Sequence, residues 1–561
     1  MTPAQTESAP QPDSADGPAT SQRAPVVIIG AGPTGLSAAA LLADFGVPSV
    51  VLERWEDVYP QPRAVHLDDE VYRILARLGL AEAFEHISRP ARGLRLVTDS
   101  LDLIAEFPRG EDIGVHGFPA ASMFDQPELE RLLRDAVAAR DLVTVRGGVE
   151  VVDISQRDSS VIVHAADRST GERLTVEGAY LLGCDGAGSL TRSVVGAHWR
   201  DFGFSQRWLV IDVETTADLR QWEGVQQVCD TRRAATYMRI GDDRYRWEFQ
   251  LLDGESASDY ADLAAVLPLM RPWLPRAADL DLRLVRCAEY TFNARVADRW
   301  RHRRIFLLGD AAHLTPPFIG QGMGAGIRDA ANLSWKLAAV LAGGVPESSL
   351  DSYESERKPH TTGLIRLAML TGALMTGGGR GGDALRGVIA PLLARLPAFV
   401  SRLADSATPA LGPSYYVRAG VAGTPVRALR GLVSADYTTA GSLAPNSVLS
   451  SSGLRLDDRA PGFALVSLDE PSPEQRFEIG RRGATVIVVD SRSGLGIWLS
   501  DHDARAALVR PDGTVMAAGR AIASIYTLIP PMPVTAEYSW SRLPHRVRRP
   551  ETCYAGRGRR R

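Results

Sequence analysis

The pattern of apolar and polar positions predicts a mixed α/β chain that begins to fold near residue 25. The run Val26-Val27-Ile28-Ile29 is typical of a short buried strand, and a helix-compatible run follows at residues 36–45 after a glycine-rich segment. A second apolar strand, Val50-Val51-Leu52, ends at Glu53. Strand, turn, helix and strand within about thirty residues have the size of one βαβ unit.

Helical and extended patterns then alternate along most of the chain. Helices are predicted at residues 68–80, 127–140 and 322–341, and strands at 143–152, 161–165, 180–182 and 305–308. Residues 208–252 are β-rich, with a predicted hairpin between 237 and 249. Alternating strands return between residues 444 and 536.

These patterns predict several folded parts between two tails. The order is a disordered polar tail (1–24), a Rossmann-like nucleotide-binding domain (25–197 and 286–360) with an inserted β-sheet substrate domain (198–285), a helical connection (361–440), a small α/β domain (441–540) and an arginine-rich tail (541–561).

Composition narrows the class of protein. Of 561 residues, 45% are hydrophobic and 23% charged, which suits a globular chain, and the net charge of −4 argues against nucleic acid as a partner. The four cysteines, Cys184, Cys229, Cys287 and Cys553, form no CxxC spacing, so neither a disulfide framework nor a zinc site is indicated. We find no export signal and no apolar run long enough for a membrane span, and expect a cytoplasmic protein.

The glycine-rich segment Gly30-Ala31-Gly32-Pro33-Thr34-Gly35 is the first candidate site. It follows a buried strand and opens a helix, so Gly30 permits a tight turn, Gly32 admits a pyrophosphate and Gly35 allows close helix–strand packing. Glu53 ends the next strand about 20 residues on, where a carboxylate accepts from ribose hydroxyls. Together these features predict a dinucleotide site.

Two later segments favour FAD over a nicotinamide nucleotide at this site. Gly183-Cys184-Asp185-Gly186 and Gly309-Asp310-Ala311-Ala312-His313 each follow a predicted strand. The second continues through Pro317-Phe318-Ile319-Gly320-Gln321-Gly322-Met323-Gly324 into a helix, whose N–H groups and dipole favour the negative charge of a reduced flavin. His313 is interpreted as structural, and no metal site is predicted.

At these residues the chain resembles the group A FAD-dependent aromatic monooxygenases of the p-hydroxybenzoate hydroxylase superfamily. Residues 62–70, 246–249 and 317–323 look most like the 3-(3-hydroxyphenyl)propionate hydroxylase branch. The resemblance implies an FAD-binding domain and, because members of that branch carry one, a thioredoxin-like domain at residues 441–540. The absence of CxxC there argues against a redox role for that domain.

The resemblance also implies cofactor contacts. Arg63 matches an arginine near the pyrophosphate and the nicotinamide approach, Gln126 and Asp310 match ribityl contacts, and Asp185 belongs to the DG motif, with a helix cap as its alternative role. Arg54 is expected either near the adenine or in solvent. The full predicted FAD set is Gly30, Ala31, Gly32, Pro33, Thr34, Gly35, Glu53, Arg54, Arg63, Gln126, Asp185, Gly309, Asp310, Pro317, Gly320, Gly322 and Met323.

The implied activity is hydroxylation of a phenolic or polycyclic aromatic compound, through a flavin C4a-hydroperoxide, with NAD(P)H and O2 as cosubstrates. No catalytic residue is assigned; Tyr237, Arg239, Phe249 and Phe318 are the candidates for the substrate pocket. Baeyer–Villiger or epoxidising oxygenation, and a flavin-binding protein or reductase without oxygenation, stay open as alternatives. Halogenation is disfavoured, because WxWxIP is absent and neither Lys336 nor Lys358 is suitably placed. The expected partner is a small aromatic substrate, with a homodimer left open.

Overall fold

The computed structural model describes residues 24–59, 64–109, 113–230, 232–275, 280–376, 409–418, 439–449 and 453–531. Arg63, the basic tail, the predicted N-terminal tail apart from Ala24 and most of the predicted helical connection lie outside the described residues. Among the described residues, no helix is long and apolar enough to cross a membrane. The described chain is a mixed α/β fold with five sheets.

A six-stranded sheet, parallel except at one edge, carries the first βαβ unit. Its strands in spatial order are β18 (Arg301–His302), β19 (Ile305–Leu307), β12 (Tyr180–Gly183), β1 (Val26–Ile29), β2 (Ser49–Leu52) and β8 (Val143–Arg146). Strand β1 is fully apolar and buried, as expected for a strand covered on both faces. The carboxyl ends of β1, β12 and β19 therefore meet at one edge, where a ligand of such a sheet binds.

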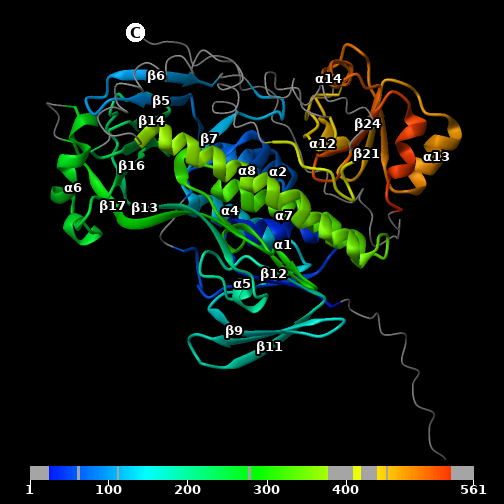
Figure 1. The fold of residues 1–561 in the computed structure, drawn as a ribbon, viewed down its shortest axis with the longest axis horizontal. Coiled ribbons are helices and arrows are strands. Elements are labelled where there is room, and N and C mark those ends of the chain that lie inside the picture. The colour runs from blue at the N-terminus through cyan, green and yellow to red at the C-terminus, as the bar shows by residue number, and fades with distance from the viewer. Residues whose placement is uncertain are drawn as a thin grey trace, which may run out of the picture.

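Helices cover this sheet and pack on one another around it (Figure 1). Helix α1 is rich in alanine, whose small side chain allows helices to pack closely. It contacts both α4 and α7. The helices of this part are α1 (Pro33–Asp44), α2 (Asp69–Arg77), α3 (Ala81–Ile87), α4 (Gln126–Ala138), α5 (Leu190–Val194), α7 (Gly322–Leu341) and α8 (Asp351–Thr376).

Two three-stranded antiparallel sheets flank the six-stranded sheet. One contains β9 (Val149–Gln156), β10 (Val161–Asp167) and β11 (Arg173–Gly178), and the other β3 (His66–Asp68), β7 (Ala121–Phe124) and β4 (Ser88–Pro90). The sequence predicted one strand over 143–152, whereas the structure has two, β8 and β9, because Gly148 turns the chain between them with φ +69°.

An eight-stranded sheet lies on the far side of α7 and α8 from the C-terminal part (Figure 1). Its strands in order are β20 (His313–Leu314), β17 (Arg283–Ala297), β13 (Trp199–Glu214), β16 (Arg244–Gln250), β15 (Ala235–Arg239), β14 (Val225–Val228), β5 (Gly93–Val97) and β6 (Leu103–Pro108). The hairpin predicted between 237 and 249 is β15 and β16. Helix α6 (Leu263–Met270) packs with one face of the sheet.

The sheet corrects the prediction of one insertion at residues 198–285. Strands β5 and β6 come from residues 93–108, and β17 runs on to Ala297, because parallel pairing of β5 with β14 joins the earlier hairpin to the later strands. One face of this sheet therefore combines side chains from segments far apart in the sequence.

A four-stranded sheet forms the C-terminal part, in the order β22 (Thr485–Val488), β21 (Ala464–Ser467), β23 (Ala506–Val509) and β24 (Val515–Gly519), with helices α12 (Leu456–Arg459), α13 (Pro473–Arg481) and α14 (Gly494–Asp501). Buried ion pairs join this part to the rest. The Arg73 and Arg77 guanidinium groups both contact Asp457, and Arg510 contacts Glu356 at 3.0 Å. The part is thus held on α2 and α8.

Candidate active site

A cavity of about 460 Å³ runs from the glycine-rich loop after β1 to the eight-stranded sheet, within the size range of small-molecule sites. Thirteen of the predicted cofactor and pocket residues line it: Ala31, Gly32, Pro33, Thr34, Glu53, Gln126, Gly309, Asp310, Pro317, Phe318, Gly320, Gly322 and Met323. The tertiary fold thus brings together motifs separated by almost 300 residues in the sequence.

The three glycines of the first loop have different surroundings. A Cβ at Gly30, whose φ is +102°, would lie 2.4 Å from the Cys184 carbonyl oxygen, and one at Gly35 would lie 2.0 Å from the Gly30 oxygen. A Cβ at Gly32 would meet nothing within 4 Å. Gly30 and Gly35 therefore permit close packing, while Gly32 leaves open space in the cavity before the uncapped start of α1, the place that suits a pyrophosphate.

Glu53 connects the end of β2 to this loop. Its Oε2 accepts a hydrogen bond from the Ala31 N–H at 2.6 Å and its Oε1 accepts from the Trp55 N–H at 2.9 Å. Carboxylate oxygens have further lone pairs, so the side chain can still accept from a ribose. Trp55 also lines the cavity, although no sequence motif pointed to it. Arg54 does not line the cavity; its guanidinium carbon lies 5.6 Å from the centroid of the Trp55 ring.

Asp185 of the DG motif is bonded to the start of α5. Its Oδ1 accepts from the Ser189 hydroxyl at 2.6 Å, and its Oδ2 accepts from the Thr191 N–H and hydroxyl, both at 2.9 Å. These bonds support the helix start, which is the alternative role expected for it. Its neighbours Gly186 and Ala187 line the cavity, whereas a direct contact of Asp185 with the cofactor stays a prediction.

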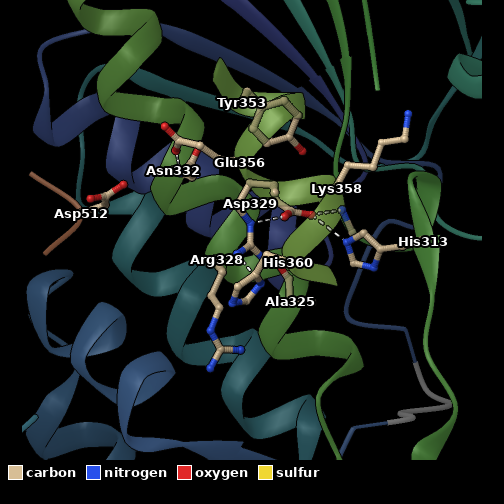
Figure 2. A network of polar contacts seen from close by, with 12 residues as sticks. His313, Ala325, Arg328, Asp329, Asn332, Tyr353, Glu356, Lys358, His360 and Asp512 are labelled. Atoms are coloured by element: carbon tan, nitrogen blue, oxygen red, sulfur yellow. Dashed lines mark hydrogen bonds and ion pairs between the residues drawn. The ribbon is translucent and has the colours of Figure 1, made fainter. Parts of the chain in front are cut away.

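The GD motif depends on a buried aspartate that the sequence analysis did not single out. The Gly309 N–H donates to Asp329 Oδ2 at 3.1 Å, His313 Nε2 lies 2.8 Å from the same oxygen, and Arg357 Nε donates to Oδ1 at 2.8 Å (Figure 2). Burial raises the pKa of Asp329, but the partners His313 and Arg357 outweigh burial and hold it below its usual value. The available signal was an Arg–Asp pair, Arg328 and Asp329, in the helix that follows the GD motif.

The start of α7 forms the wall between the two ends of the cavity. Gly320 has φ +63°, and a Cβ there would lie 2.7 Å from His66 Nδ1, so the turn into the helix needs glycine. Gln321 donates to Asp68 Oδ2 at 2.8 Å and accepts from Arg328 Nη1 at 2.9 Å. No side chain caps the first turn, which leaves its N–H groups available for an anion.

Gln126 holds the opposite wall. Its Oε1 accepts from the Ala64 N–H at 2.7 Å, and its Nε2 donates to Glu130 Oε1 at 2.6 Å. Phe318 lies where the walls approach the eight-stranded sheet, with its ring 5.7 Å from Phe204 and 6.2 Å from Trp208 between centroids. These aromatic rings make the sheet end of the cavity apolar on one side.

The structure does not bring Tyr237, Arg239 and Phe249 into the cavity. Tyr237 and Phe249 belong to the core cluster on the other face of the sheet, and Arg239 pairs with Glu223 at 2.9 Å. Strand side chains alternate between faces, so the residues next to them, Thr236, Met238 and Glu248, line the cavity together with Gln227, Trp208 and Tyr290. The predicted strands were correct, and the predicted face was not.

Buried charges cover the cavity face beside these residues. Arg246 Nε and Nη2 donate to Asp212 at 2.7 and 2.9 Å, and Arg286 Nη2 lies 2.9 Å from the same carboxylate. Burial raises the pKa of Asp212, but the two guanidinium groups outweigh it and hold the pKa below its usual value. Glu248 lies near this group and has its pKa raised, because burial outweighs the attraction of Arg246.

The chain matches the family described as "FAD binding domain" over residues 23–368. It is 33% identical over 524 residues to a protein of Rhodococcus jostii (strain RHA1) named "Probable NADH-specific resorcinol 4-hydroxylase", covering 89% of this chain and 93% of that protein. It is 35% identical over 356 residues to a 3-(3-hydroxy-phenyl)propionate/3-hydroxycinnamic acid hydroxylase of Burkholderia cenocepacia (strain HI2424), covering 63% of this chain and 64% of that protein.

Solved structures share the fold. The flavin-dependent monooxygenase PieE, in complex with FAD and substrate, matches with a TM-score of 0.75 and 24% identity over 91% of this chain and 98% of its own. Aklavinone-11 hydroxylase, in a ternary complex with FAD and aklavinone, matches with a TM-score of 0.73 and 22% identity over 92% of this chain and 99% of its own. These similarities extend across the C-terminal part as well.

Proposed function

The chain belongs to the FAD-binding-domain family, as its motifs predicted, and from this premise we propose that it is an NADH-consuming, FAD-dependent hydroxylase of a small phenolic compound. The main observation behind the proposal is that one continuous cavity joins the glycine-rich loop after β1 to a polar, largely buried face of the eight-stranded sheet. The relative from Rhodococcus jostii, named as NADH-specific, supports NADH as the cosubstrate.

The residues of the cavity fit FAD. The Ala31–Thr34 loop would hold the pyrophosphate, Glu53 the ribose, Gln126 and Asp310 the ribityl chain, and Gly322 and Met323 the ring system. When bound, FAD supplies hydride acceptance from NADH and activation of O2. The start of α7 stabilises negative charge, while Phe318, Trp208 and Met238 exclude water from the sheet end of the cavity.

The finer domain arrangement is part of the same proposal. The six-stranded sheet and its helices would be the Rossmann-like FAD-binding domain, and the eight-stranded sheet the substrate side. The C-terminal sheet, in which α13 links the parallel strands β21 and β22 and β23–β24 form a hairpin, supports a thioredoxin-like domain. The cytoplasmic location and the homodimer stay predictions.

The test is NADH oxidation by the purified protein with and without resorcinol or 3-(3-hydroxyphenyl)propionate, together with product masses. We expect a yellow protein, faster NADH oxidation with one of these phenols, and a product heavier by one oxygen atom with its carbon ring intact. Ring expansion would indicate Baeyer–Villiger oxygenation and an epoxide epoxidation. Absence of bound flavin, or oxidation without any oxygenated product, contradicts the proposal.

Gly32→Ala tests the cofactor end of the cavity. The Gly32 backbone has φ −75°, which alanine adopts easily, and its Cβ would meet no protein atom within 4 Å, so the fold should be kept. The methyl group would occupy the space left for the pyrophosphate, and we expect the affinity for FAD to fall by about tenfold or more, that is about 1.4 kcal/mol. Gly480→Ala, equally open but in α13, is the control that should leave FAD binding unchanged.

A further inference from the structure

Glu248 lies in the middle of the eight-stranded sheet on the face that lines the cavity. In the strand register it is opposite Thr236 on β15 and Val210 on β13, and Thr236 is in turn opposite Gln227 on β14. The Thr236 hydroxyl donates to Gln227 Oε1 at 2.7 Å. Strands on both sides therefore fix the backbone of Glu248, and its side chain is 90% shielded from solvent.

The positive charges near Glu248 are already engaged. Arg246, two residues earlier on the same face, makes its short contacts with Asp212, and Arg286 contacts the same aspartate. Within the described part of the chain, the shortest polar contact of the Glu248 carboxylate is to Arg246 Nη1 at 3.9 Å, which is longer than a hydrogen bond. The carboxylate thus lies beside a cation that attracts it without donating to it.

Among the described residues, no protein group donates a hydrogen bond to the Glu248 carboxylate, whose oxygens therefore keep lone pairs that can accept. Glu248 faces the cavity rather than the core, so a ligand in the cavity can be their partner. The partner must be a hydrogen-bond donor, since an ionised carboxylate only accepts. A phenolic hydroxyl is such a donor, and the aromatic and methionine side chains nearby suit its ring.

We propose that Glu248 is a catalytic residue which binds the phenolic hydroxyl of the substrate and accepts its proton, an inference that rests on the proposed function. The phenolic O–H bond breaks, the proton goes to a carboxylate oxygen of Glu248, and the electron pair stays on the phenol oxygen and enriches the ring. After the ring receives one oxygen atom from O2, the hydrogen on that carbon leaves as a proton, and Glu248 returns its own proton to the phenol oxygen. NADH supplies the two electrons that reduce the other oxygen atom to water.

Three charged groups on three adjacent strands determine how well Glu248 performs this task. Arg246 on β16 and Arg286 on β17 favour its charged form, whereas Asp212 on β13 and burial disfavour it, and burial is the largest influence. The result is a pKa above the usual value, closer to that of the proton donor, which makes the carboxylate a stronger base. Arg286 also donates a hydrogen bond to the hydroxyl of Tyr290, another residue of the cavity lining, at 3.1 Å. Arg286 thus acts as a positioning residue for Tyr290 as well as for Glu248.

The test compares the wild-type holoenzyme with Glu248→Gln, using whichever of resorcinol and 3-(3-hydroxyphenyl)propionate the wild type hydroxylates. We expect the variant to bind FAD normally and to lose about 10²-fold in kcat at pH 7. Its activity should recover as the pH rises toward about 10, where a phenol ionises without a base. The absorbance change of the flavin on adding the phenol should show weaker binding, and 2-fluororesorcinol, a more acidic phenol, should be hydroxylated with a smaller loss.

Thermal stability separates a catalytic from a structural role. A group whose pKa is raised on folding opposes folding when it is ionised, so the neutral glutamine should leave Tm at or above the wild-type value at pH 7. The matched control is Glu289→Gln on β17, which removes a surface carboxylate that pairs with Arg207 and should change neither kcat nor the pH profile.

Two results would overturn the inference while the proposed function stands. The first is a wild type that hydroxylates the phenol and a Glu248→Gln variant with the same kcat and pH profile. The second is a variant with lowered Tm whose loss of kcat is equal at every pH, which is the signature of a packing defect. If the wild type hydroxylates no phenol, the proposed function fails and the inference fails with it.

Discussion

The two faces of the eight-stranded sheet are built from alternate residues of the same strands, yet they are stabilised differently. The face toward α6 is an aromatic core in which the Tyr237 ring lies 5.3 Å from Trp247 and 6.1 Å from Trp273. The cavity face buries Asp212, Arg246 and Arg286 at hydrogen-bond distances. The first face gains free energy from the apolar area it buries. On the second face, the buried Arg246 and Arg286 avoid a large cost of burial because they share the Asp212 carboxylate.

An aromatic core needs no polar partner, whereas the charge cluster shares its face of the sheet with the residues that line the cavity. On the proposed function, that cluster would provide fixed charges beside the substrate. One residue of sequence separates the two environments, as at Thr236 and Tyr237.

The largest effect is expected for Asp212→Asn on the cavity face. The change leaves the buried Arg246 and Arg286 without their shared carboxylate, and breaking such a pair costs about 3–5 kcal/mol of unfolding free energy. Urea unfolding at pH 7 would measure the loss, and Glu289→Gln, at an exposed pair, should cost little. A loss no larger than that of Glu289→Gln would contradict the view that pairing stabilises this face.

The same pair predicts a pH dependence. Because the pKa of Asp212 is held below its usual value in the folded protein, its contribution to stability is full above about pH 5 and is lost as the pH falls through the pKa of the folded state. The difference in unfolding free energy between wild type and Asp212→Asn should therefore be constant above about pH 5 and shrink below it. Unfolding curves at several pH values measure it, and a difference that does not shrink at low pH would contradict the assignment.

An intermediate effect is expected for Phe249→Leu on the aromatic face. The ring is buried against Trp273, so the smaller side chain should lower the unfolding free energy by about 1–2 kcal/mol. Because the side chain lies away from the cavity, kcat and KM of the folded enzyme should be unchanged. A change in KM for the phenol would mean that this face contributes to the substrate site after all.

The smallest effect is expected for Thr236→Val, compared with its neighbour Tyr237→Phe. The valine removes the hydrogen bond from the Thr236 hydroxyl to Gln227, which should lower the unfolding free energy by about 1 kcal/mol. Both side chains line the cavity, so KM for the phenol should also rise. Tyr237→Phe, on the other face, should leave KM unchanged. Steady-state kinetics of both variants decide whether adjacent residues of β15 differ in function, and equal effects would argue against it.

Local sequence rules located the residues that the structure gathers at one end of the cavity. A tight turn, a close approach and an acidic strand end lie within one βαβ unit, so Gly30, Gly32 and Glu53 could be singled out without a fold. The sheet end could not be identified this way. Choosing between Tyr237 and Thr236 depends on which face the strand turns to the cavity, and periodicity alone does not orient a sheet that is buried on both faces.

The family, the βαβ unit and the hairpin of β15 and β16 could be read from the sequence, as could a set of residues that line one end of the cavity, because these depend on short-range spacing and on backbone conformations that glycine allows. Tertiary structure decided that Asp185 is bonded to the start of α5, that Asp329 supports the GD turn, and that β5 and β6 join the large sheet. It also decided that Glu248 faces the cavity. These features depend on long-range contacts, where a side chain's partner comes from a segment that no local pattern specifies.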